Sequence, residues 1–308
     1  DTMVHLTEEN DFMVLEGDEY LSSPMDRRPK FHLYQPNIAL ISGIAWDHIN
    51  VFPTYENYVE QFEIFIQCIT NGGILVYNED DSEVKRVAEA ATNPIRKLPY
   101  KTPNYKVENG ITLLETPEGD MPIEVFGAHN LNNLAGAKWI CQNMGVDEAD
   151  FYEAIASFKG ASKRLEKIAE SKNKVAYKDF AHSPSKVAAT TKAVKEQYPD
   201  RTVVACLELH TYSSLNAEFL KEYEGALAYA DVAVVFYSPD AVKIKQLEEV
   251  TYDQIAKAFN REDLIIYTNP SEFKEYLFNL NLDNSALLLM SSGNYGGLNF
   301  DEVKGLIG

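Results

Sequence analysis

Residues 175–209, VAYKDFAHSPSKVAATTKAVKEQYPDRTVVACLEL, decide the fold because two kinds of pattern alternate along them. The runs 175–180 and 202–209 are short and rich in β-branched and aliphatic residues, which is typical of buried parallel strands. Between them a helical pattern covers about 184–197, and Pro184 suits the first position of a helix. The order strand, helix, strand predicts a βαβ unit in a parallel sheet.

The same alternation continues on both sides of this unit. Later in the chain we expect strands at 231–237, 264–268 and 285–290, with helical segments near 214–227, 240–259 and 271–279. Earlier we expect buried strands at 11–16, 37–44 and 72–78 and helices at 54–70, 129–145 and 147–158. Thr54 is a candidate N-cap and Gly145 a candidate left-handed residue after a helix. The pattern predicts an α/β protein with a doubly wound parallel sheet.

The length of the chain predicts more than one domain. A chain of 308 residues exceeds what one hydrophobic core comfortably fills, so two domains are expected. The lysine- and glutamate-rich segment 158–174 is the best candidate for the junction. We therefore expect one domain over 1–162 and a second over 163–308.

The charge of the chain limits its partners. Lys and Arg number 28 against 47 Asp and Glu, which gives a formal net charge of −19. A field of that sign repels phosphate backbones, so general nucleic-acid binding is excluded. An anionic small substrate then requires a local basic pocket or a metal ion.

Cysteine usage and hydropathy indicate the compartment. The three cysteines, Cys68, Cys141 and Cys206, are widely spaced and form no CxxC pair, which favours a reducing, cytoplasmic setting. No apolar run approaches the roughly 20 residues that span a bilayer. The first residues show no signal peptide, so no membrane partner is expected.

Acidic and histidine side chains follow the first two expected strands. Glu16, in EGDEY, could hold Mg²⁺ beside a nucleotide, because Mg²⁺ prefers hard oxygen ligands and often takes only one or two carboxylates. An acidic surface loop is the simpler alternative. Asp47 and His48 follow the next strand, and a metal role is less natural for His48 than for Glu16. A histidine that caps the next helix explains His48 equally well.

Two further segments favour a nucleotide. In GAHNLNN (127–133), Asn130 and Asn133 lie one helical turn apart, and an amide both donates and accepts, which suits a purine edge. Capping by Asn130 is the alternative. In FKGASKRLE (158–166) and the residue after it, Lys159, Lys163, Arg164 and Lys167 form a basic patch suited to phosphate, or else a solvated linker face.

The second half carries three more candidates, each directly after a strand. Asp179 and His182 project from a strand-to-helix turn, where a carboxylate can take a ribose hydroxyl and a histidine can contact phosphate. ELHTYSS (208–214) and MSSGNYGG (290–297) also follow strands, and the glycines of the latter let backbone approach a ligand closely. Neither is a dinucleotide fingerprint, and no GxxxxGK[ST] occurs in these residues.

The order of these motifs resembles the Mur ligase family of ATP-dependent enzymes that assemble the peptide of peptidoglycan precursors. The order is Glu-x-Asp-Glu, Asp-His, Gly-x-His-Asn-x-x-Asn, Phe-x-Gly-x-x-[basic]-Arg-x-Glu and Asp-[aromatic]-Ala-His-x-Pro. The resemblance extends from about residue 11 to the end. It implies a partial central ATP-binding domain followed by a Rossmann-like C-terminal domain.

The resemblance also implies roles for individual residues. It places Glu16 as a ligand of Mg²⁺ and His48 at or near a second Mg²⁺. It places Asn130 and Asn133 against adenine, with His129 nearby. It places Arg164 and Asp179 in contact with the ATP. His182, together with Arg164, would lie at the reaction centre. The residues that present the incoming amino substrate would be His210, Tyr212, Ser213 and Asn294.

Details within the family favour one substrate class. EGDEYLSSPMDRRPKF (16–31) and MSSGNYGGLN (290–299) resemble members that join UDP-N-acetylmuramate to the murein tripeptide, with L-alanine-adding members as the alternative. A non-catalytic nucleotide-binding module is an alternative of another class. The family's P-loop and UDP-sugar domain have no counterpart in these residues, so we expect a portion of a longer ligase that is inactive alone. The 208–214 segment also lacks the arginine that both the tripeptide-adding and the L-alanine-adding members have in this region.

Overall fold

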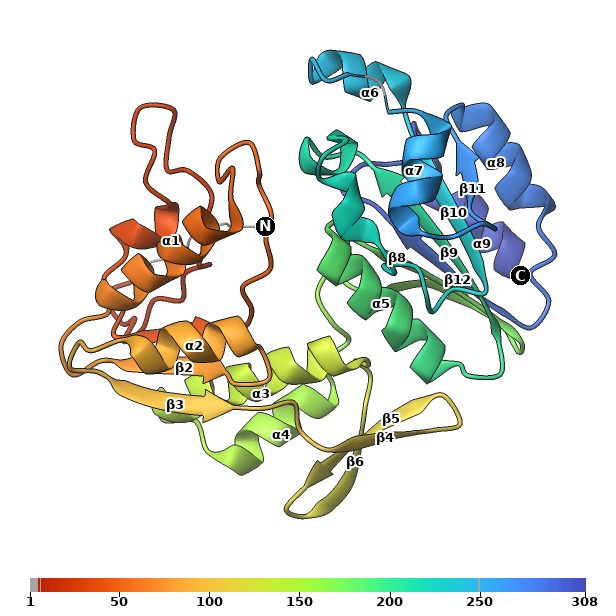
Figure 1. The fold of residues 1–308 in the computed structure, drawn as a ribbon. Coiled ribbons are helices and arrows are strands. Elements are labelled where there is room, and N and C mark those ends of the chain that lie inside the picture. Colours follow the sequence, from red (N-terminus) through yellow and green to blue (C-terminus); the bar gives the residue numbers. More distant parts are fainter. Residues whose placement is uncertain (1–4, 6, 249) are drawn as a thin grey trace. The chain divides into compact units, whose positions relative to one another are not determined.

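The structure is a computed structural model that describes residue 5, residues 7–248 and residues 250–308 (Figure 1). The chain packs as two compact units. Unit 1 consists of the described residues of Asp1–Trp46, Val51–Lys101 and Leu134–Tyr152, and unit 2 of Asp47–Asn50, Thr102–Asn133 and Glu153–Gly308. The predicted α/β class is confirmed, and the boundary between 162 and 163 stays a prediction.

Unit 1 is built on a parallel sheet in the order β1-β2-β3. Its strands are β1 (Ile38–Ile41), β2 (Ile74–Asn78) and β3 (Arg96–Tyr100). Helix α1 (Tyr55–Gln67) and helix α2 (Ser82–Ala90) pack on β2 through a core that includes Ile66, Leu75 and Val84. A 3₁₀ turn, η1 (Lys30–Leu33), adds Phe31 to the same core. The strands at 37–44 and 72–78 and the helix at 54–70 are thereby confirmed.

Local signals explain where these helices begin and end. The Thr54 hydroxyl accepts the Asn57 N–H at 3.2 Å, so Thr54 is the N-cap of α1 as predicted. Helices α3 (Ala128–Asn143) and α4 (Glu148–Ala156) form close to the expected ranges. Gly145 lies between them with a φ of 93°, which confirms the left-handed residue after α3.

The strand predicted at 11–16 is wrong. These residues form no strand, and Phe12, Met13, Val14 and Leu15 are 52%, 60%, 80% and 53% exposed. An apolar run becomes a strand only when a neighbouring strand completes its hydrogen bonds. Within the described residues β1 pairs with β2 alone, and 11–16 has no place in that ladder.

Unit 2 is built on a six-stranded sheet in the order β11-β10-β9-β12-β8-β7. All neighbours are parallel except β7, an antiparallel edge strand. The strands are β7 (Glu166–Glu170), β8 (Lys174–Asp179), β9 (Thr202–Leu209), β10 (Val232–Tyr237), β11 (Ile265–Tyr267) and β12 (Ser285–Met290). The last strand in sequence therefore lies between the second and the third, which is a doubly wound arrangement.

Helices cover both faces of this sheet (Figure 1). Helix α5 (Pro184–Gln197) packs on β9 and β12 on one face, where the Thr191 hydroxyl contacts the Met290 sulfur. Helices α8 (Pro270–Asn279) and α9 (Phe300–Ile307) pack on the other face. Because side chains alternate along a strand, Val204 and Cys206 of β9 face α8 and α9.

Two helix predictions in unit 2 are wrong or incomplete. Residues 214–227 form 3₁₀ turns, η2 (Ser213–Leu215) and η3 (Leu220–Tyr223), because the Asn216 side chain accepts the N–H groups of the turn and Gly225 has a φ of 73°. The helix at 240–259 is two helices, α6 (Pro239–Ile244) and α7 (Tyr252–Phe259). Gln246, with a φ of 57°, follows the first of them.

The sequence patterns also missed a small antiparallel sheet. Strands β4 (Tyr105–Glu108), β5 (Ile111–Thr116) and β6 (Gly119–Ile123) form two hairpins. The Thr112 hydroxyl donates to the Gln197 side chain at 2.9 Å, which joins this sheet to α5. The sheet leads directly into the turn before α3, where several predicted site residues lie.

Candidate functional site

The carboxyl edge of the six-stranded sheet gathers most of the predicted residues of unit 2. Strands β8, β12 and β9 are adjacent, and Met290 is in register with Asp179 on one side and Leu207 on the other. Open α/β sheets bind ligands outside the carboxyl ends of their strands, where the strand order reverses. The loops after these three strands are therefore where a ligand of unit 2 is expected.

Asp179 organises the first of these loops. Its side chain is buried, and its two oxygens accept the N–H groups of Leu165 and Ala181, both at 2.6 Å. The contact with Leu165 fixes the segment that carries the basic patch, where Lys163 and Leu165 both have positive φ. Asp179 therefore shapes the loop, and its predicted contact with ribose stays a prediction.

Arg164 and His129 lie beside Asp179. The Arg164 guanidinium is exposed and lies 5.5 Å from the centre of the Phe180 ring. Burial lowers the pKa of His129, an effect that Asp179 opposes and Arg164 reinforces. The structure thus brings together three residues predicted to hold a nucleotide, in positions where charge on one affects the others.

The two predicted amides have different environments. The Asn130 side chain donates to the Phe126 carbonyl at 2.9 Å, so part of its hydrogen-bonding capacity serves the start of α3. Asn133 is exposed, one turn further along the same helix. Its amide is available to a ligand, whereas the amide of Asn130 must share its hydrogen bonds with the helix.

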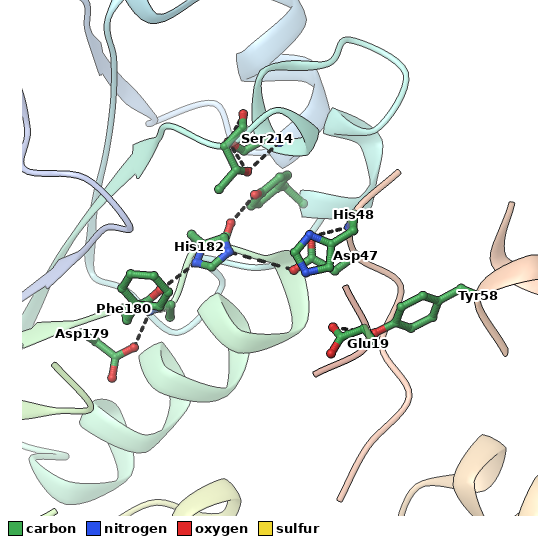
Figure 2. A network of polar contacts seen from close by, with 11 residues as sticks. Glu19, Asp47, His48, Tyr58, Asp179, Phe180, His182 and Ser214 are labelled. Atoms are coloured by element: carbon green, nitrogen blue, oxygen red, sulfur yellow. Dashed lines mark hydrogen bonds and ion pairs between the residues drawn. The ribbon is translucent and has the colours of Figure 1, made fainter. Parts of the chain in front are cut away.

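His182 has a defined tautomer. Its Nδ1 lies 2.8 Å from the Phe180 carbonyl oxygen, which can only accept, so Nδ1 carries the proton and Nε2 is unprotonated in the neutral ring. Nε2 lies 3.9 Å from Asp47 Oδ2, and Figure 2 shows the ring between these two groups. Burial lowers the pKa of His182, and this outweighs the Phe180 carbonyl and Asp47, which favour the charged ring. His182 is therefore a neutral base with one nitrogen aimed at a carboxylate.

The surroundings of His182 hold it in place. The Tyr223 hydroxyl donates to the His182 carbonyl oxygen, and Tyr223 is fully buried against Phe259. Asp47 is buried and its Oδ1 accepts the N–H of His48, the second residue predicted near a metal. His48 itself has a positive φ of 55°.

The predicted metal ligands, the Glu16 carboxylate and the His48 imidazole, do not belong to a complete set of metal ligands among the described residues. Glu16, in unit 1, is exposed. Within the described part of the chain, no three His, Cys, Asp or Glu side chains gather in an arrangement that could hold a metal ion. Glu16 fits Mg²⁺ only as one oxygen ligand among phosphates and waters, which is the usual mode for this ion.

The loops after β9 and β12 carry the other predicted residues. His210 and Tyr212 are partly exposed, whereas Ser213 is buried in η2. The glycine loop, residues 291–297, follows β12 and contains Asn294, which is exposed. The Asn294 side chain oxygen accepts the Gly297 N–H at 3.2 Å.

Sequence reasoning missed Glu208, Ser291 and Tyr295. Glu208 is 2% exposed near the end of β9, and its carboxylate accepts hydrogen bonds from the other two residues. The available signal was a charged residue inside the apolar run TVVACLEL. Such a residue is rarely buried without a partner.

Family models match most of the chain. The Mur ligase middle domain matches residues 1–141, and the Mur ligase glutamate ligase domain matches residues 163–293. Among residues 5, 7–248 and 250–308, no helix has the length and apolar character needed to cross a membrane.

Two curated relatives are named for the same activity. The chain is 28% identical over 237 residues to a UDP-N-acetylmuramate–L-alanine ligase of Caldicellulosiruptor bescii, covering 73% of this chain and 50% of the relative. It is 26% identical over 299 residues to the ligase of the same name from Lactococcus lactis, covering 92% and 63%. The chain thus spans between half and 63% of the length of these relatives.

Solved structures confirm the fold. A murein peptide ligase from Psychrobacter arcticus matches with a TM-score of 0.64 at 18% identity, covering 99% of this chain and 65% of that one. A MurF ligase from Thermotoga maritima, solved in complex with ADP, matches with a TM-score of 0.61 at 16% identity, covering 88% and 61%. At these identities the match concerns the fold alone.

Proposed function

This chain belongs to the Mur ligase family, and we propose that the full-length protein is an ATP-dependent ligase of peptidoglycan precursors. It would join an amino substrate to the carboxyl group of UDP-N-acetylmuramate. The observation that carries this proposal is the grouping of Arg164, His129 and Asp179 at the carboxyl edge of the sheet, within the ranges that the family models match. This grouping supplies a cation and polar groups to a nucleotide in a chain of net charge −19.

The reaction we propose has two steps. The muramoyl carboxylate attacks the γ-phosphorus of ATP, and ADP departs with the electrons of the broken bond. The free amine of the second substrate then attacks the acyl carbon, phosphate leaves, and the proton of the amine passes to a base. Phosphorylation is required because a carboxylate is a poor electrophile and phosphate is a good leaving group.

Cationic and polar residues of unit 2 are proposed to orient the nucleotide. Arg164, exposed and held over Phe180, would contact phosphate oxygens, and Asn133 would contact the adenine. Mg²⁺, held by Glu16 and phosphate oxygens, would offset charge on the transferred phosphoryl group. His48 remains proposed as a residue near a second Mg²⁺.

His182 is proposed to accept the proton of the attacking amine. Its unprotonated Nε2 and the Asp47 carboxylate lie 3.9 Å apart, too far for a direct hydrogen bond. An ammonium nitrogen beside this pair, within hydrogen-bond distance of each atom, would contact both, and the neutral imidazole could remove a proton from it. The Phe180 carbonyl supports this role because it fixes the tautomer.

The amino substrate we propose is the murein tripeptide, on the strength of segments 16–31 and 290–299. L-Alanine is the second candidate, because the curated relatives described above are named for it. Residues His210, Tyr212, Ser213 and Asn294 are proposed to meet this substrate.

Phosphate release by the full-length protein tests the proposal. Purified protein is given ATP, Mg²⁺ and UDP-N-acetylmuramate with either the tripeptide or L-alanine, and the product mass is measured. We expect phosphate and a ligated product only when the tripeptide is present. Product only with L-alanine would show that L-alanine, and not the tripeptide, is the amino substrate, and the proposed ligase activity would stand. Nucleotide binding without any ligation would favour the non-catalytic module.

Asn133→Ala is expected to weaken ATP binding about tenfold, because an exposed amide on the purine edge contributes on the order of 1–1.5 kcal/mol. Calorimetric titration of ATP measures this. Asn143→Ala is the matched control, since Asn143 is an amide on the same helix that donates to the Trp139 carbonyl. Equal affinities of wild type and Asn133→Ala would remove Asn133 from the nucleotide site.

A further inference from the structure

Glu208 is a buried carboxylate with an organising set of partners. It lies one residue before the end of β9 and is 2% exposed. Burying an ionised carboxylate is costly unless hydrogen bonds or an opposite charge compensate it. The partners of Glu208 come from the glycine loop after β12 and from His210.

One carboxylate oxygen holds three positions of the glycine loop. The Ser291 hydroxyl donates to Glu208 Oε2, and the Tyr295 N–H donates to the same oxygen at 2.8 Å. The Gly293 N–H in turn donates to the Ser291 hydroxyl at 2.7 Å. Alternate residues of the loop are thus tied, directly or through Ser291, to one side chain of a neighbouring strand.

Tyr295 shows that the loop is held in an unusual conformation. Its φ is 53°, a region that bulky residues seldom adopt. Its hydroxyl donates to the carbonyl oxygens of Cys206 and Met290, and its ring stacks on Phe273 at 5.1 Å. These contacts fix the Tyr295 side chain, and the hydrogen bond from the Tyr295 N–H to Glu208 fixes its backbone.

His210 lies next to the same carboxylate. Its Nδ1 lies 3.7 Å from Glu208 Oε1, and its side chain is 42% exposed. A Cβ on Gly293 would lie 2.8 Å from Glu208 Oε2 and 3.0 Å from the His210 ring. The loop backbone therefore lies directly against both side chains, and a larger residue at 293 would push against them.

We propose that Glu208 is a positioning residue that sets the glycine loop and His210 to receive the amino substrate. This inference rests on the function proposed above. Glu208 is too buried to touch substrate, so it acts through the exposed groups it arranges. The Asn294 side-chain oxygen already accepts the Gly297 N–H. The amide hydrogens of Asn294 can therefore donate to a ligand. They suit a carboxylate or a peptide carbonyl of the amino substrate.

Glu208→Gln in the full-length protein tests this proposal, because it keeps the shape and removes the charge and one acceptor. We expect the backbone amides of 291–298 to exchange hydrogen at least about tenfold faster, since the Tyr295 N–H loses its ionic acceptor. We expect the KM for the amino substrate to rise about tenfold or more, with the KM for ATP within about twofold. Ser291→Ala, which removes only the hydroxyl link, should show both effects in smaller measure.

Asp231→Asn is the matched control. Asp231 lies at the opposite edge of the same sheet, where its carboxylate accepts the Val203 N–H at 2.7 Å and a hydrogen bond from Lys195 at 2.8 Å. This variant should lower the melting temperature yet leave exchange at 291–298 and the KM for the amino substrate unchanged.

The outcomes separate the inference from the function on which it rests. Unchanged exchange at 291–298 in Glu208→Gln would show that Glu208 does not hold the loop and overturn the proposal. Faster exchange with an unchanged KM for the amino substrate would overturn it as well. If wild type ligates neither tripeptide nor L-alanine, the proposed function fails, and the substrate role of Glu208 fails with it, while the exchange difference still decides whether Glu208 holds the loop.

Discussion

His182→Gln in the full-length protein is expected to lower kcat by about two to four orders of magnitude with little change in the KM for ATP. Glutamine keeps a polar side chain but cannot take a proton from the attacking amine. The Phe180 carbonyl fixes the proton of the neutral ring on Nδ1, which leaves Nε2 as the base. Loss of this group therefore affects the second step of the reaction more than nucleotide binding.

The pH profile supplies an independent measurement. Because burial lowers the pKa of His182, the ring stays neutral to a lower pH than an exposed histidine does. The value of kcat/KM should fall as pH drops through that lowered pKa, and this fall should be absent in His182→Gln. His32→Gln, a histidine of unit 1 that contacts the Gln61 carbonyl, should behave as wild type. A His182→Gln enzyme with near-normal kcat would rule out a base role.

Gly127→Ala is expected to destabilise unit 2 by about 2–5 kcal/mol, the largest stability effect we anticipate. Gly127 has a φ of 88°, which strains any residue with a Cβ. Its added Cβ would lie 2.4 Å from the Cβ of Ala193, a buried residue of α5, and 3.2 Å from the His129 ring. Either α5 or the start of α3 must move, which would also displace His129.

Gly225→Ala separates the two causes. Gly225 belongs to the same unit and has a φ of 73°, but a Cβ there would meet nothing within 4 Å. It should cost only the backbone strain, about 1–2 kcal/mol. Urea denaturation of both variants gives the comparison. Equal losses would mean that contact with Ala193 adds nothing and that the turn before α3 adjusts freely.

The elements that sequence predicted well are those whose local pattern and tertiary environment agree. Helix α5 forms over 184–197 and β9 over 202–209 as expected, because an apolar helical face and a buried aliphatic run both find partners in the sheet. The apolar run 11–16 has the same local pattern as a buried strand but no neighbour to pair with. Local pattern alone cannot distinguish these cases.

The residues of the candidate site also differ in whether a local sequence pattern reveals them. The sequence correctly places Asp179 and His182 at a strand-to-helix turn, since Pro184 marks the start of α5. The sequence does not reveal Glu208 as a site residue, because its partner Tyr295 lies 87 residues further along the chain. Hydrogen bonds over such separations arise from strand order, and neither β9 nor β12 contains a local sign that they are neighbours.

The central position of β12 has a consequence for synthesis of the protein. Strands β8 and β9 do not pair with each other, and β12 lies between them and pairs with both. During translation the pairing of β8 and β9 with the rest of this sheet is therefore complete only after β12 has left the ribosome. We expect nascent chains that stop before 285 to be recognised by chaperones, and a premature stop codon there to yield aggregated polypeptide.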